Sequence, residues 1–595
     1  MHSFWLEEYE DFQEFHFHIV DYIIFCGMLI VSAGTGIYYG YYKKNTIIEH
    51  IDPKCRRGSG LSFGSKKLSE YLLGSRSLAT FPVAMSLIGS YVSGVTVLGT
   101  PAEIYNFGTQ YWLTVIPVML MALTVSTVYL PVFTTLRICS SYEYLELRFS
   151  SGIRSFASFL FIIDEILFLP IILYVPAIAF NQVTGLNIHL ISGIVCVVCV
   201  FYTLLGGIKA VVSTDAWQIL VMFISVTVVV IIGTTYIGGP SEVIKRSLEG
   251  GRIRFSNFNP SLYERHSVWS VVVGGYFYWV SFNSVNQTMV QRYMSLPTKK
   301  SAQVSIVLFA IGICLFVSIC CFAGLLIFAY YSKCDPLTAG LIQTDDQLFP
   351  VYVMQIAGHI TGIPGLFVAG IFGACLSSLS VVLNCTSAVL LEDIVKGCFK
   401  IHLSEKASHF LVKTSVVVFG VIATLLVVVL EKLGGILAVA TSLSSIAAGT
   451  TSGIFTLGML IPWSNTKGAT FGALAGALIS GTVSLGSQVF TAEGLLVPQK
   501  LQVWVDECPA FLNITAPSTD VPDQSELFPL FRISFLWVGP IGMLTVLFVG
   551  TIVSFLTGPT KVSKLDADLL SPVIHRFLPK ECFINQTVEV NTSLT

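Results

Sequence analysis

The amino-acid sequence predicts an all-α, polytopic membrane protein. Of its 595 residues, 54% are hydrophobic and only 11% are charged, and the mean hydropathy is +0.76. Soluble globular domains carry about 25% charged residues, so this composition excludes an ordinary soluble fold. The formal net charge is −2. Because the chain has no overall basic bias, nucleic acid is not an expected partner, whereas the lipid bilayer is.

The apolar runs of the sequence predict about thirteen transmembrane helices, since ~20 apolar residues suffice to cross a bilayer. The runs fall at residues 19–40, 77–99, 110–133, 155–179, 188–206, 216–238, 266–286, 303–331, 362–391, 410–431, 435–461, 466–488 and 530–557. Acidic residues such as Glu7, Glu8 and Glu10 precede the first run, where a cleaved signal peptide would be basic. We therefore expect residues 19–40 to be a retained, extra amino-terminal helix that follows an extracellular segment, 1–18.

Basic residues predict the orientation of the chain, because short cytoplasmic loops are enriched in Lys and Arg. They gather in alternate connections: Lys43, Lys44, Lys54, Arg56, Arg57, Lys66 and Lys67; Arg137, Arg148 and Arg154; Lys209; Arg292, Lys299 and Lys300; Lys396, Lys400 and Lys406; Lys561 and Lys564. This pattern predicts an amino terminus outside and a carboxyl terminus inside, with 558–595 as a cytoplasmic tail. Segment 239–265 is also rich in Arg yet falls outside, where the bias is weaker for a longer loop.

The loop 489–529 separates two accessory helices within residues 466–557 and is predicted to lie outside. Asn513 begins an Asn-Ile-Thr sequence in this loop and is the expected N-glycosylation site. Cys334 and Cys508 also fall in outer loops, on the oxidising side of the membrane. The sequence is compatible with a disulfide between them and with two free thiols.

The other cysteines are scattered, many of them within apolar runs, where they are typical small core residues. No cluster of His and Cys has the spacing of a metal site, so the sequence predicts no metal or organic cofactor. It also contains no nucleophile elbow, metal-ligand helix or phosphate loop, and we do not expect an enzyme.

The stretch 361–396 is the polar centre of the apolar sequence. It is long enough to span a membrane but contains Ser377, Ser378, Ser380, Asn384 and Thr386. In one interpretation each hydroxyl bonds a carbonyl one turn earlier in its own helix. In the other, the adjacent serines offer neutral oxygen ligands to a dehydrated monovalent cation, which avoids burying a protein charge.

Two spans are interrupted by glycine and polar residues, as in transporters that are built from inverted repeats. The second span contains Gly89-Ser90 and Ser93-Gly94, and the seventh contains Gly274-Gly275 followed by Asn283, Ser284 and Asn286. Five spans separate their starts, and an odd number of helices per repeat inverts the second copy. We therefore expect repeats at 77–238 and 266–461, although these glycines are also compatible with close helix packing alone.

Three acidic residues are predicted within the membrane, where ionised groups are costly and usually functional. Asp215 begins the sixth span, and Asp164 and Glu165 are adjacent in the fourth. Neighbours on a helix point about 100° apart, so Asp164 and Glu165 can share one small site only if the helix is distorted, for example by Pro170. We expect one of them to face the bundle and pair with a basic residue, and Asp215 to serve either ion coupling or a structural pairing at the helix start.

Several segments together resemble the solute:sodium symporter family, and within it the animal branch of monocarboxylate, multivitamin and iodide transporters. They are SEYLLGSRSLATFPVAMSLIGSYVSGVTVLGTPAEIYNFG, SSYEYLELRFS, YVPAIAFNQVTGLNI, FYTLLGGIKAVVSTDAWQ, SVNQTMVQRYMS, KCDPLTAG and VLLEDIVK. The similarity runs in order from about residue 70 to about residue 490. It implies a LeuT-like fold, with ten core helices in an inverted 5+5 repeat whose first helices are broken, and transport by alternating access.

The resemblance also implies site residues. The sodium site would be formed by carbonyls of Gly89, Val92 and Ala374 and hydroxyls of Ser377 and Ser378. The substrate pocket would be lined by Tyr91, Thr96, Trp279, Asn283 and Thr441, and a second sodium or coupling site would involve Asp215 and Gln218. The chain departs from the family at Phe168, where a hydroxyl-bearing aromatic residue is usual, and at Asp164 and Glu165. Thr96, Asn283 and Thr441 resemble the organic-anion carriers more than the iodide carriers.

These features predict a sodium-coupled symporter that moves a small organic anion, such as a monocarboxylate or a vitamin-like carboxylate, across the plasma membrane. Its partners would be sodium, that anion and the bilayer. The alternatives are a sodium-dependent ligand sensor or leak pathway with little net transport, and a symporter of iodide, another anion or a sugar.

Overall fold

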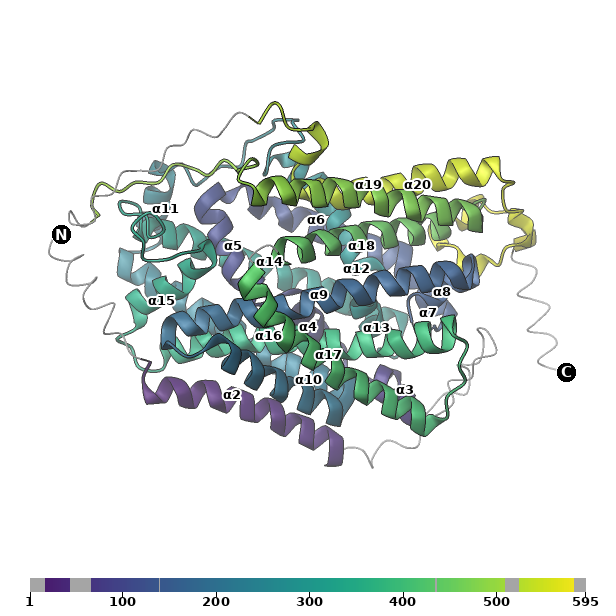
Figure 1. The fold of residues 1–595 in the computed structure, drawn as a ribbon, viewed down its shortest axis with the longest axis horizontal. Helices are drawn as coiled ribbons and strands as arrows, with labels where there is room; N and C mark the ends of the chain where they lie inside the picture. Colours follow the sequence, from purple (N-terminus) through teal and green to yellow (C-terminus); the bar gives the residue numbers. More distant parts are fainter. Residues whose placement is uncertain (1–16, 43–65, 139, 434–435, 509–523, 583–595) are drawn as a thin grey trace.

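The computed structural model describes residues 17–42, 66–138, 140–433, 436–508 and 524–582. Of residues 42, 66–69, 75, 430–433, 436–443 and 564 it describes the backbone only. Within these residues the chain is helical and contains no β-strand, as the sequence predicts (Figure 1).

The helices follow one another along the whole described chain. The first part contains α2 (Ile19–Ile37), α3 (Lys66–Leu73), α4 (Thr80–Tyr91), α5 (Gly94–Phe107), α6 (Val115–Thr124), α7 (Leu130–Leu136), α8 (Glu143–Arg148), α9 (Ser151–Thr184), α10 (Ile188–Ile237) and α11 (Pro240–Glu249). The second part contains α12 (Gly275–Ser284), α13 (Gln287–Met294), α14 (Lys299–Tyr330), α15 (Leu348–Ala357), α16 (Ile363–Val389), α17 (Glu405–Leu433), α18 (Ile436–Leu460), α19 (Thr466–Ala492) and α20 (Val538–Leu556). Short π-helical stretches precede α12 and follow α6 and α16.

Nine helices of the described chain are long and apolar enough to cross a membrane, and the bent pair α4 and α5 makes a tenth span. The sequence predicts thirteen spans, and two of them, 188–206 and 216–238, correspond to two helices that share the label α10 and meet at a kink. The 50 residues of α10 would extend about 75 Å as one straight helix. Gly207 divides α10 into two helical segments, with φ 54° and ψ −151°. A Cβ at Gly207 would lie 2.7 Å from the carbonyl oxygen of Tyr71.

The second predicted span is broken in the middle. Helix α4 ends at Tyr91, Val92 and Ser93 are non-helical, and α5 begins at Gly94 at an angle of 61° to α4. The seventh span is also interrupted, because α12 ends at Ser284 and the Asn286 side chain caps the amide of Thr288, near the start of α13, at 2.9 Å. The glycine and polar residues of the sequence therefore mark real discontinuities, and these leave backbone carbonyls without helical donors.

Helix α16 forms the centre of the bundle and is buried along nearly all of its length. It packs against α10, α9 and α2. Pro176 in α9 cannot donate to the carbonyl of Ile172. The Cys375 thiol of α16 lies 3.1 Å from that carbonyl and donates to it. The interface between α9 and α16 thus satisfies a backbone group that the proline leaves free.

Helix α2 is attached to the start of α16. The Asp21 carboxylate accepts the amides of Gly362 at 3.0 Å and Gly365 at 2.9 Å, which have no donor role within the helix. A Cβ at Gly365 would lie 2.4 Å from the Cα of Asp21, so glycine permits this close approach. The extra amino-terminal helix is therefore fixed to the central helix by a side-chain cap.

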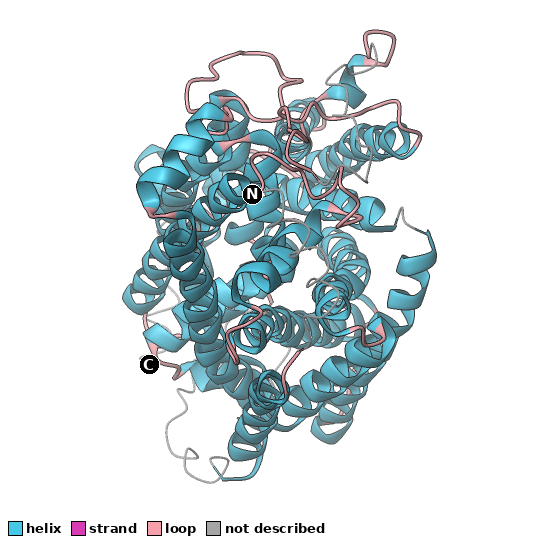
Figure 2. Cartoon of the chain, turned by 90° about the vertical axis from the view of Figure 1, so that its left-hand side faces the viewer, coloured by secondary structure: helices cyan, strands magenta, loops and turns pink. Residues whose placement is uncertain are grey.

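The other helices surround this centre. Helix α2 lies at one edge, and α19 and α20 lie together at the other (Figure 1). Helices α11 and α15 lie at one end of the bundle, and α3, α7 and α8 lie at the other. Viewed from the end that carries α11 and α15, most helices are seen nearly end-on (Figure 2).

Candidate functional site

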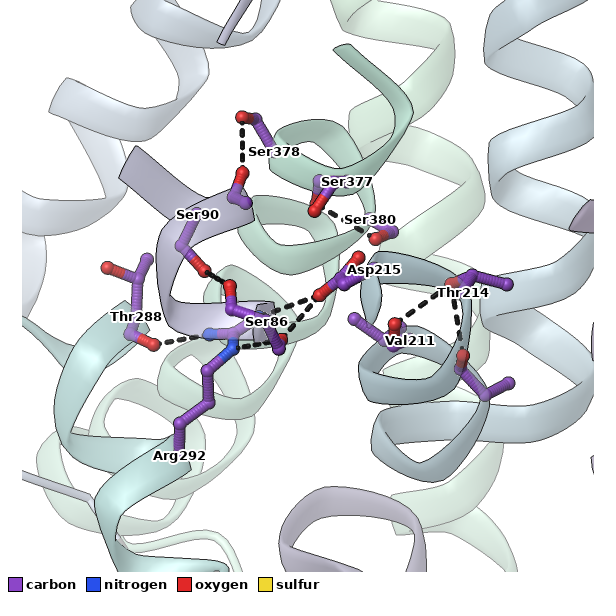
Figure 3. Close-up of polar contacts among 12 residues, drawn as sticks. Ser86, Ser90, Val211, Thr214, Asp215, Thr288, Arg292, Ser377, Ser378 and Ser380 are labelled. Atoms are coloured by element: carbon purple, nitrogen blue, oxygen red, sulfur yellow. Dashed lines mark hydrogen bonds and ion pairs between the residues drawn. The ribbon is translucent and has the colours of Figure 1, made fainter. Parts of the chain in front are cut away.

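The break after α4 faces the serine pair of α16. The Ser378 hydroxyl donates to the carbonyl of Gly89 at 2.9 Å (Figure 3). The helical ladder of α4 stops close by, where the amide of Val92 donates to the carbonyl of Ile88 at 2.8 Å. A hydroxyl and a carbonyl from two different elements are therefore in direct contact at the helix break.

Ser377 lies on the same side of α16 and has an oxygen without a normal hydrogen bond. Its side chain is fully buried, and its hydroxyl makes no hydrogen bond of normal geometry within the described structure, although it interacts with the nearby Asp215 carboxylate. A Cβ at Gly89 would lie 2.1 Å from that oxygen, so Ser377 closely faces α4. A buried hydroxyl without a well-formed hydrogen bond is costly and suggests a ligand.

The other two expected sodium ligands lie beside this contact in the chain. Val92, fully buried, is the first non-helical residue after α4. Ala374, also fully buried, is one turn before Ser377 and Ser378 in α16. The five residues expected to form the sodium site thus belong to the two elements that meet at the break.

Asp215 of α10 belongs to a polar network next to the serines. Its carboxylate accepts the Ser86 hydroxyl of α4 at 2.5 Å, and Ser86 accepts the Arg292 Nε of α13 at 2.7 Å. Arg292 Nη2 lies 3.9 Å from the carboxylate. Figure 3 shows this carboxylate between Ser86 and Arg292 on one side and Ser377 and Ser380 on the other. The second carboxylate oxygen, Oδ1, has no described partner and can accept a further ligand.

Gln218 does not join Asp215 in this network. Its amide nitrogen donates to the Ser32 hydroxyl of α2 at 3.0 Å, and its oxygen is buried without a described partner. Asp215 instead interacts with Ser86 of α4, Arg292 of α13 and Ser377 of α16. The expected second coupling site is therefore not assembled from these two side chains in this conformation, because each is held by a different helix.

The expected substrate residues include a pair of stacked aromatic rings. Tyr91 at the end of α4 and Trp279 of α12 have ring centroids 4.1 Å apart and an interplanar angle of 29°. The indole nitrogen of Trp279 donates to the Thr114 hydroxyl at 3.1 Å. The two broken spans therefore meet at an aromatic contact, which lies beside the helix break that carries the serine contact.

The polar substrate residues are partly engaged within the protein. The Asn283 amide nitrogen donates to the carbonyl of Trp279 at 2.8 Å, and its oxygen has no described partner. In this conformation Asn283 offers a ligand an acceptor. Thr96 is half-buried, and its hydroxyl contacts the carbonyl of Tyr91 at 3.5 Å. Thr441 lies in α18, in the stretch whose side chains fall outside the described residues.

The adjacent acids of α9 differ from the expectation of one buried ion pair. Both are 6% exposed, so both lie inside the bundle. Asp164 accepts the Ser444 hydroxyl of α18 at 2.5 Å. Among the described residues neither carboxylate forms an ion pair with Lys, Arg or His. Phe168, one turn further along α9, is a partly buried apolar residue that packs against the core.

Sequence reasoning missed Ser86, Thr114, Arg292 and Ser444. Arg292 follows the seventh span and looks like a basic residue of an inner loop, but its side chain is 1% exposed and it binds Ser86. Its position directly after the broken span was the available signal. Ser86 lies one turn before Gly89-Ser90, but an isolated serine in an apolar helix carries no signal of its own.

The segments that carry Cys334 and Cys508 are linked to one another. Cys334 and Cys508 form a disulfide across a sequence separation of 174 residues. Next to it, the Asp335 amide donates to the carbonyl of Trp504 at 2.9 Å. Asn513 lies outside the described residues.

The basic segment 239–265, the exception to the charge pattern, holds its arginines in contacts. Arg252 is fully buried, and its Nε donates to the carbonyl of Tyr105 at 3.0 Å. Burial lowers the pKa of Arg252 to about 10, so it stays charged at neutral pH. Arg265 binds the Glu103 carboxylate at 2.6 Å. These arginines therefore make tertiary contacts.

The chain is similar to several known transporters along nearly its whole length. Sodium-coupled monocarboxylate transporter 2 of Mus musculus is 35% identical over 94% of this chain and 88% of its own. Sodium-coupled monocarboxylate transporter 1 of Homo sapiens is 34% identical over 92% of this chain and 88% of its own. The sodium/iodide cotransporter of Homo sapiens is 34% identical over 92% of this chain and 85% of its own.

A solved structure shows the same fold. It is the substrate-bound outward-open state of a Na⁺-coupled sialic acid symporter, which matches with a TM-score of 0.73 and 21% identity over 91% of this chain and 99% of that one. The sequence profile of the Sodium:solute symporter family matches residues 71–476, which include both broken spans and the serine pair. The chain is a member of the sodium:solute symporter family.

Proposed function

We propose that this protein is a sodium-coupled symporter that moves a small organic anion across the plasma membrane by alternating access. The contact between the Ser378 hydroxyl and the Gly89 carbonyl carries the proposal, together with the Ser377 hydroxyl beside it, which makes no hydrogen bond of normal geometry. Neutral hydroxyl and carbonyl oxygens suit a monovalent cation, and a broken helix can supply such carbonyls within a membrane. The sodium ion would replace the Ser378 hydrogen bond and hold α4 and α16 together through their oxygen atoms.

The sodium site would consist of the carbonyls of Gly89, Val92 and Ala374 and the hydroxyls of Ser377 and Ser378. Sodium bound there would link α16 to the end of α4, where the chain turns into α5. Because the bond network of Asp215, Ser86 and Arg292 joins α4 to α10 and α13, a shift of α4 would reach the second broken span. Asp215 would contribute to coupling through its free Oδ1 atom.

The anion would bind at Tyr91 and Trp279, whose rings stack on one another and would separate to hold an organic body. The Thr96 hydroxyl would donate to its carboxylate, since its contact with the Tyr91 carbonyl is long. Asn283 would need to turn its amide to donate, because its nitrogen is engaged. The named monocarboxylate carriers among the relatives support a carboxylate substrate.

Two inverted repeats, 77–238 and 266–461, would rock against one another, followed by two accessory helices in 466–557. With the amino terminus outside, the membrane potential would drive the sodium ion inward with about 2.3 kcal/mol per charge per 100 mV. One sodium ion and one monovalent anion together carry no net charge, so a 1:1 symporter would accumulate the substrate through the sodium concentration gradient alone. The potential would add to this only if a second sodium ion is carried.

Sodium-dependent uptake tests the proposal. Cells that express the chain would be given labelled lactate or pyruvate, biotin or pantothenate, iodide and glucose, with and without sodium. We expect uptake of an organic anion that requires sodium and is lost in Ser377→Ala/Ser378→Ala. The matched control is Ser387→Ala, because this buried serine of α16 only bonds the carbonyl of Leu383 at 2.7 Å.

If only iodide or only glucose is taken up, the proposed substrate class is wrong and the protein is a symporter of that other solute. Ligand-evoked sodium current without uptake, in cells that carry the protein at their surface, would contradict symport and favour the sensor or leak pathway. The sensor or leak alternative is tested because Asp164 and Glu165 are buried without a basic partner among the described residues.

A further inference from the structure

The interior of the bundle contains two carboxylates that have no positive partner. Asp164 and Glu165 of α9 are each 6% exposed. Asp164 accepts one hydroxyl, that of Ser444. Glu165 has neither a hydrogen-bond donor nor a basic side chain in contact with it anywhere in the described chain. An ionised carboxylate so deeply buried without a partner is strongly unfavourable, so this position calls for a bound positive charge.

The groups around the pair supply no positive charge. The titratable side chains that interact with it electrostatically are Tyr142 before α8, Tyr278 of α12 and Cys385 of α16. Arg154, on the same helix, is already paired with Asp393 and Glu146. Other titratable groups on segments packed against α9 have partners elsewhere: Glu103 contacts Arg265, Asp215 contacts Ser86, Asp345 contacts Lys500 and His409 contacts Tyr71. Lys413 and Lys467 are exposed.

A metal ion fits this position poorly. Sodium needs several oxygen ligands around it, whereas Asp164 and Glu165 reach different neighbours. Asp164 contacts α18, and Glu165 interacts with Cys385 of α16. No described oxygen donor set surrounds Glu165. A proton needs only one carboxylate oxygen, and it removes the charge completely.

We infer that Glu165 is a proton-binding site, with Asp164 beside it held by Ser444, and that the protein binds a proton in addition to its coupling ion. The proton would form an O–H bond with a Glu165 carboxylate oxygen and leave it neutral. Asp164 interacts electrostatically with Tyr278, which precedes Trp279 in α12. A proton on Glu165 would remove one of the two negative charges of the acid pair, and would so lower the repulsion that an anion meets near Trp279.

The binding site itself can be tested without any substrate. In the purified full-length protein, infrared difference spectra between acidic and alkaline buffer should contain the C=O band of a protonated, buried carboxyl group. We expect this band to be lost in Glu165→Gln and kept in Glu493→Gln, where the acid is exposed. A band that is unchanged in a folded Glu165→Gln variant would overturn the inference.

A measurement on the unmutated protein covers the case in which Glu165→Gln does not fold. An apolar carbodiimide reacts with protonated carboxyl groups in membranes, and mass spectrometry locates the adduct. We expect an adduct at Glu165 in acidic buffer that is lost in alkaline buffer. Absence of this adduct at every pH, in folded protein, would overturn the inference. A lower number of bound sodium ions in Glu165→Gln, with an unchanged carboxyl band, would assign the site to sodium instead.

The consequence for transport rests on the proposed function. In proteoliposomes with an internal pH dye, sodium-driven uptake of the anion should acidify the lumen, and this acidification should be lost in Glu165→Gln. If no anion is taken up while the carboxyl band still behaves as expected, the proposed function fails and the proton site stands. Uptake without acidification and without the carboxyl band would support the proposed symport and contradict the proton-binding site.

Discussion

At the scale of single residues, the glycine at position 89 brings α4 and α16 together. A Cβ there would lie 2.1 Å from the Ser377 hydroxyl oxygen and 3.0 Å from two carbon atoms of Ile219. The serine hydroxyl cannot withdraw far, because it lies in a helix that is buried on all sides. The absence of a side chain at Gly89 is therefore needed for the carbonyl to meet the serine pair.

Gly89→Ala is expected to weaken sodium binding, because its methyl group would push the carbonyl away from Ser377 and Ser378. We predict that the sodium concentration needed for half-maximal uptake rises at least about tenfold, equivalent to ~1.4 kcal/mol. The control is Gly99→Ala in α5, where a Cβ would meet nothing within 4 Å. Unchanged sodium dependence in Gly89→Ala would show that α4 does not form the site.

The residue scale also shows what the sequence can predict. Ser377 and Ser378 stand out because paired hydroxyls in an apolar run need partners, and the structure does place Ser378 against Gly89. The contact of Ser86 with Asp215 spans 129 residues of sequence. Nothing local marks Ser86 for this contact, since it depends on how α4 and α10 pack. The lack of a basic partner for Asp164 likewise depends on tertiary structure.

At the scale of elements, Arg292 connects three helices. It binds Ser86 of α4 and the carbonyl of Thr288 in its own helix, α13, and it lies 3.9 Å from Asp215 of α10. Among the described residues, Arg292 is the only positively charged side chain that interacts with the Asp215 carboxylate. The two broken spans are joined through it.

Arg292→Ala should destabilise the protein strongly, because it leaves the Asp215 carboxylate buried without a positive charge. Removing one partner of a buried pair costs about 3–5 kcal/mol. We predict a lower unfolding temperature in Arg292→Ala and partial recovery in Arg292→Ala/Asp215→Asn, measured in detergent as a double-mutant cycle. Additive effects of the two substitutions would mean that the pair is not coupled.

The attachment of α2 to α16 gives a second prediction at this scale. Asp21→Ala removes the acceptor for the amides of Gly362 and Gly365, and loss of such a cap costs roughly 1 kcal/mol. We expect a modest fall in unfolding temperature. Asp21→Asn retains an acceptor oxygen, so its unfolding temperature should fall less than that of Asp21→Ala. Equal losses for both variants would indicate that the charge, and not the cap, stabilises the start of α16.

Element boundaries were predictable where the sequence itself changes. The break in the second span was visible because Gly89, Ser90, Ser93 and Gly94 interrupt an apolar run, and the structure ends α4 at Tyr91. The bounds of the spans were less predictable. The runs 188–206 and 216–238 do correspond to the two helical segments of α10, but the second segment begins directly after Gly207 and includes residues that the hydropathy pattern treats as a loop.

At the scale of the whole molecule, the segment after α14 and the one after α19 are tied together. Cys334 and Cys508 form a disulfide, and the Glu507 amide donates to the carbonyl of Lys333 at 3.2 Å. Lys333 and Glu507 also form an ion pair. These contacts join the accessory part of the chain to the part that carries the two broken spans.

Removal of this disulfide should destabilise the protein by about 2–4 kcal/mol, because a long closed loop restricts the unfolded chain. We predict equal falls in unfolding temperature for Cys334→Ser, Cys508→Ser and the double variant. A membrane-impermeant reductant applied to intact cells should reproduce the effect, as the predicted outer position requires. Protection from that reductant would place these segments inside and reverse the orientation.

The central claim for the whole molecule is that sodium binds where α4 is broken against α16. Equilibrium binding of radioactive sodium to the purified chain tests it most directly, since it needs no knowledge of the substrate. We predict saturable binding in the unmutated protein and in Ser387→Ala, and binding at least about tenfold weaker in Ser377→Ala/Ser378→Ala, or ~1.4 kcal/mol. Unchanged affinity in the folded double variant would contradict the claim and move the sodium site away from the serine pair.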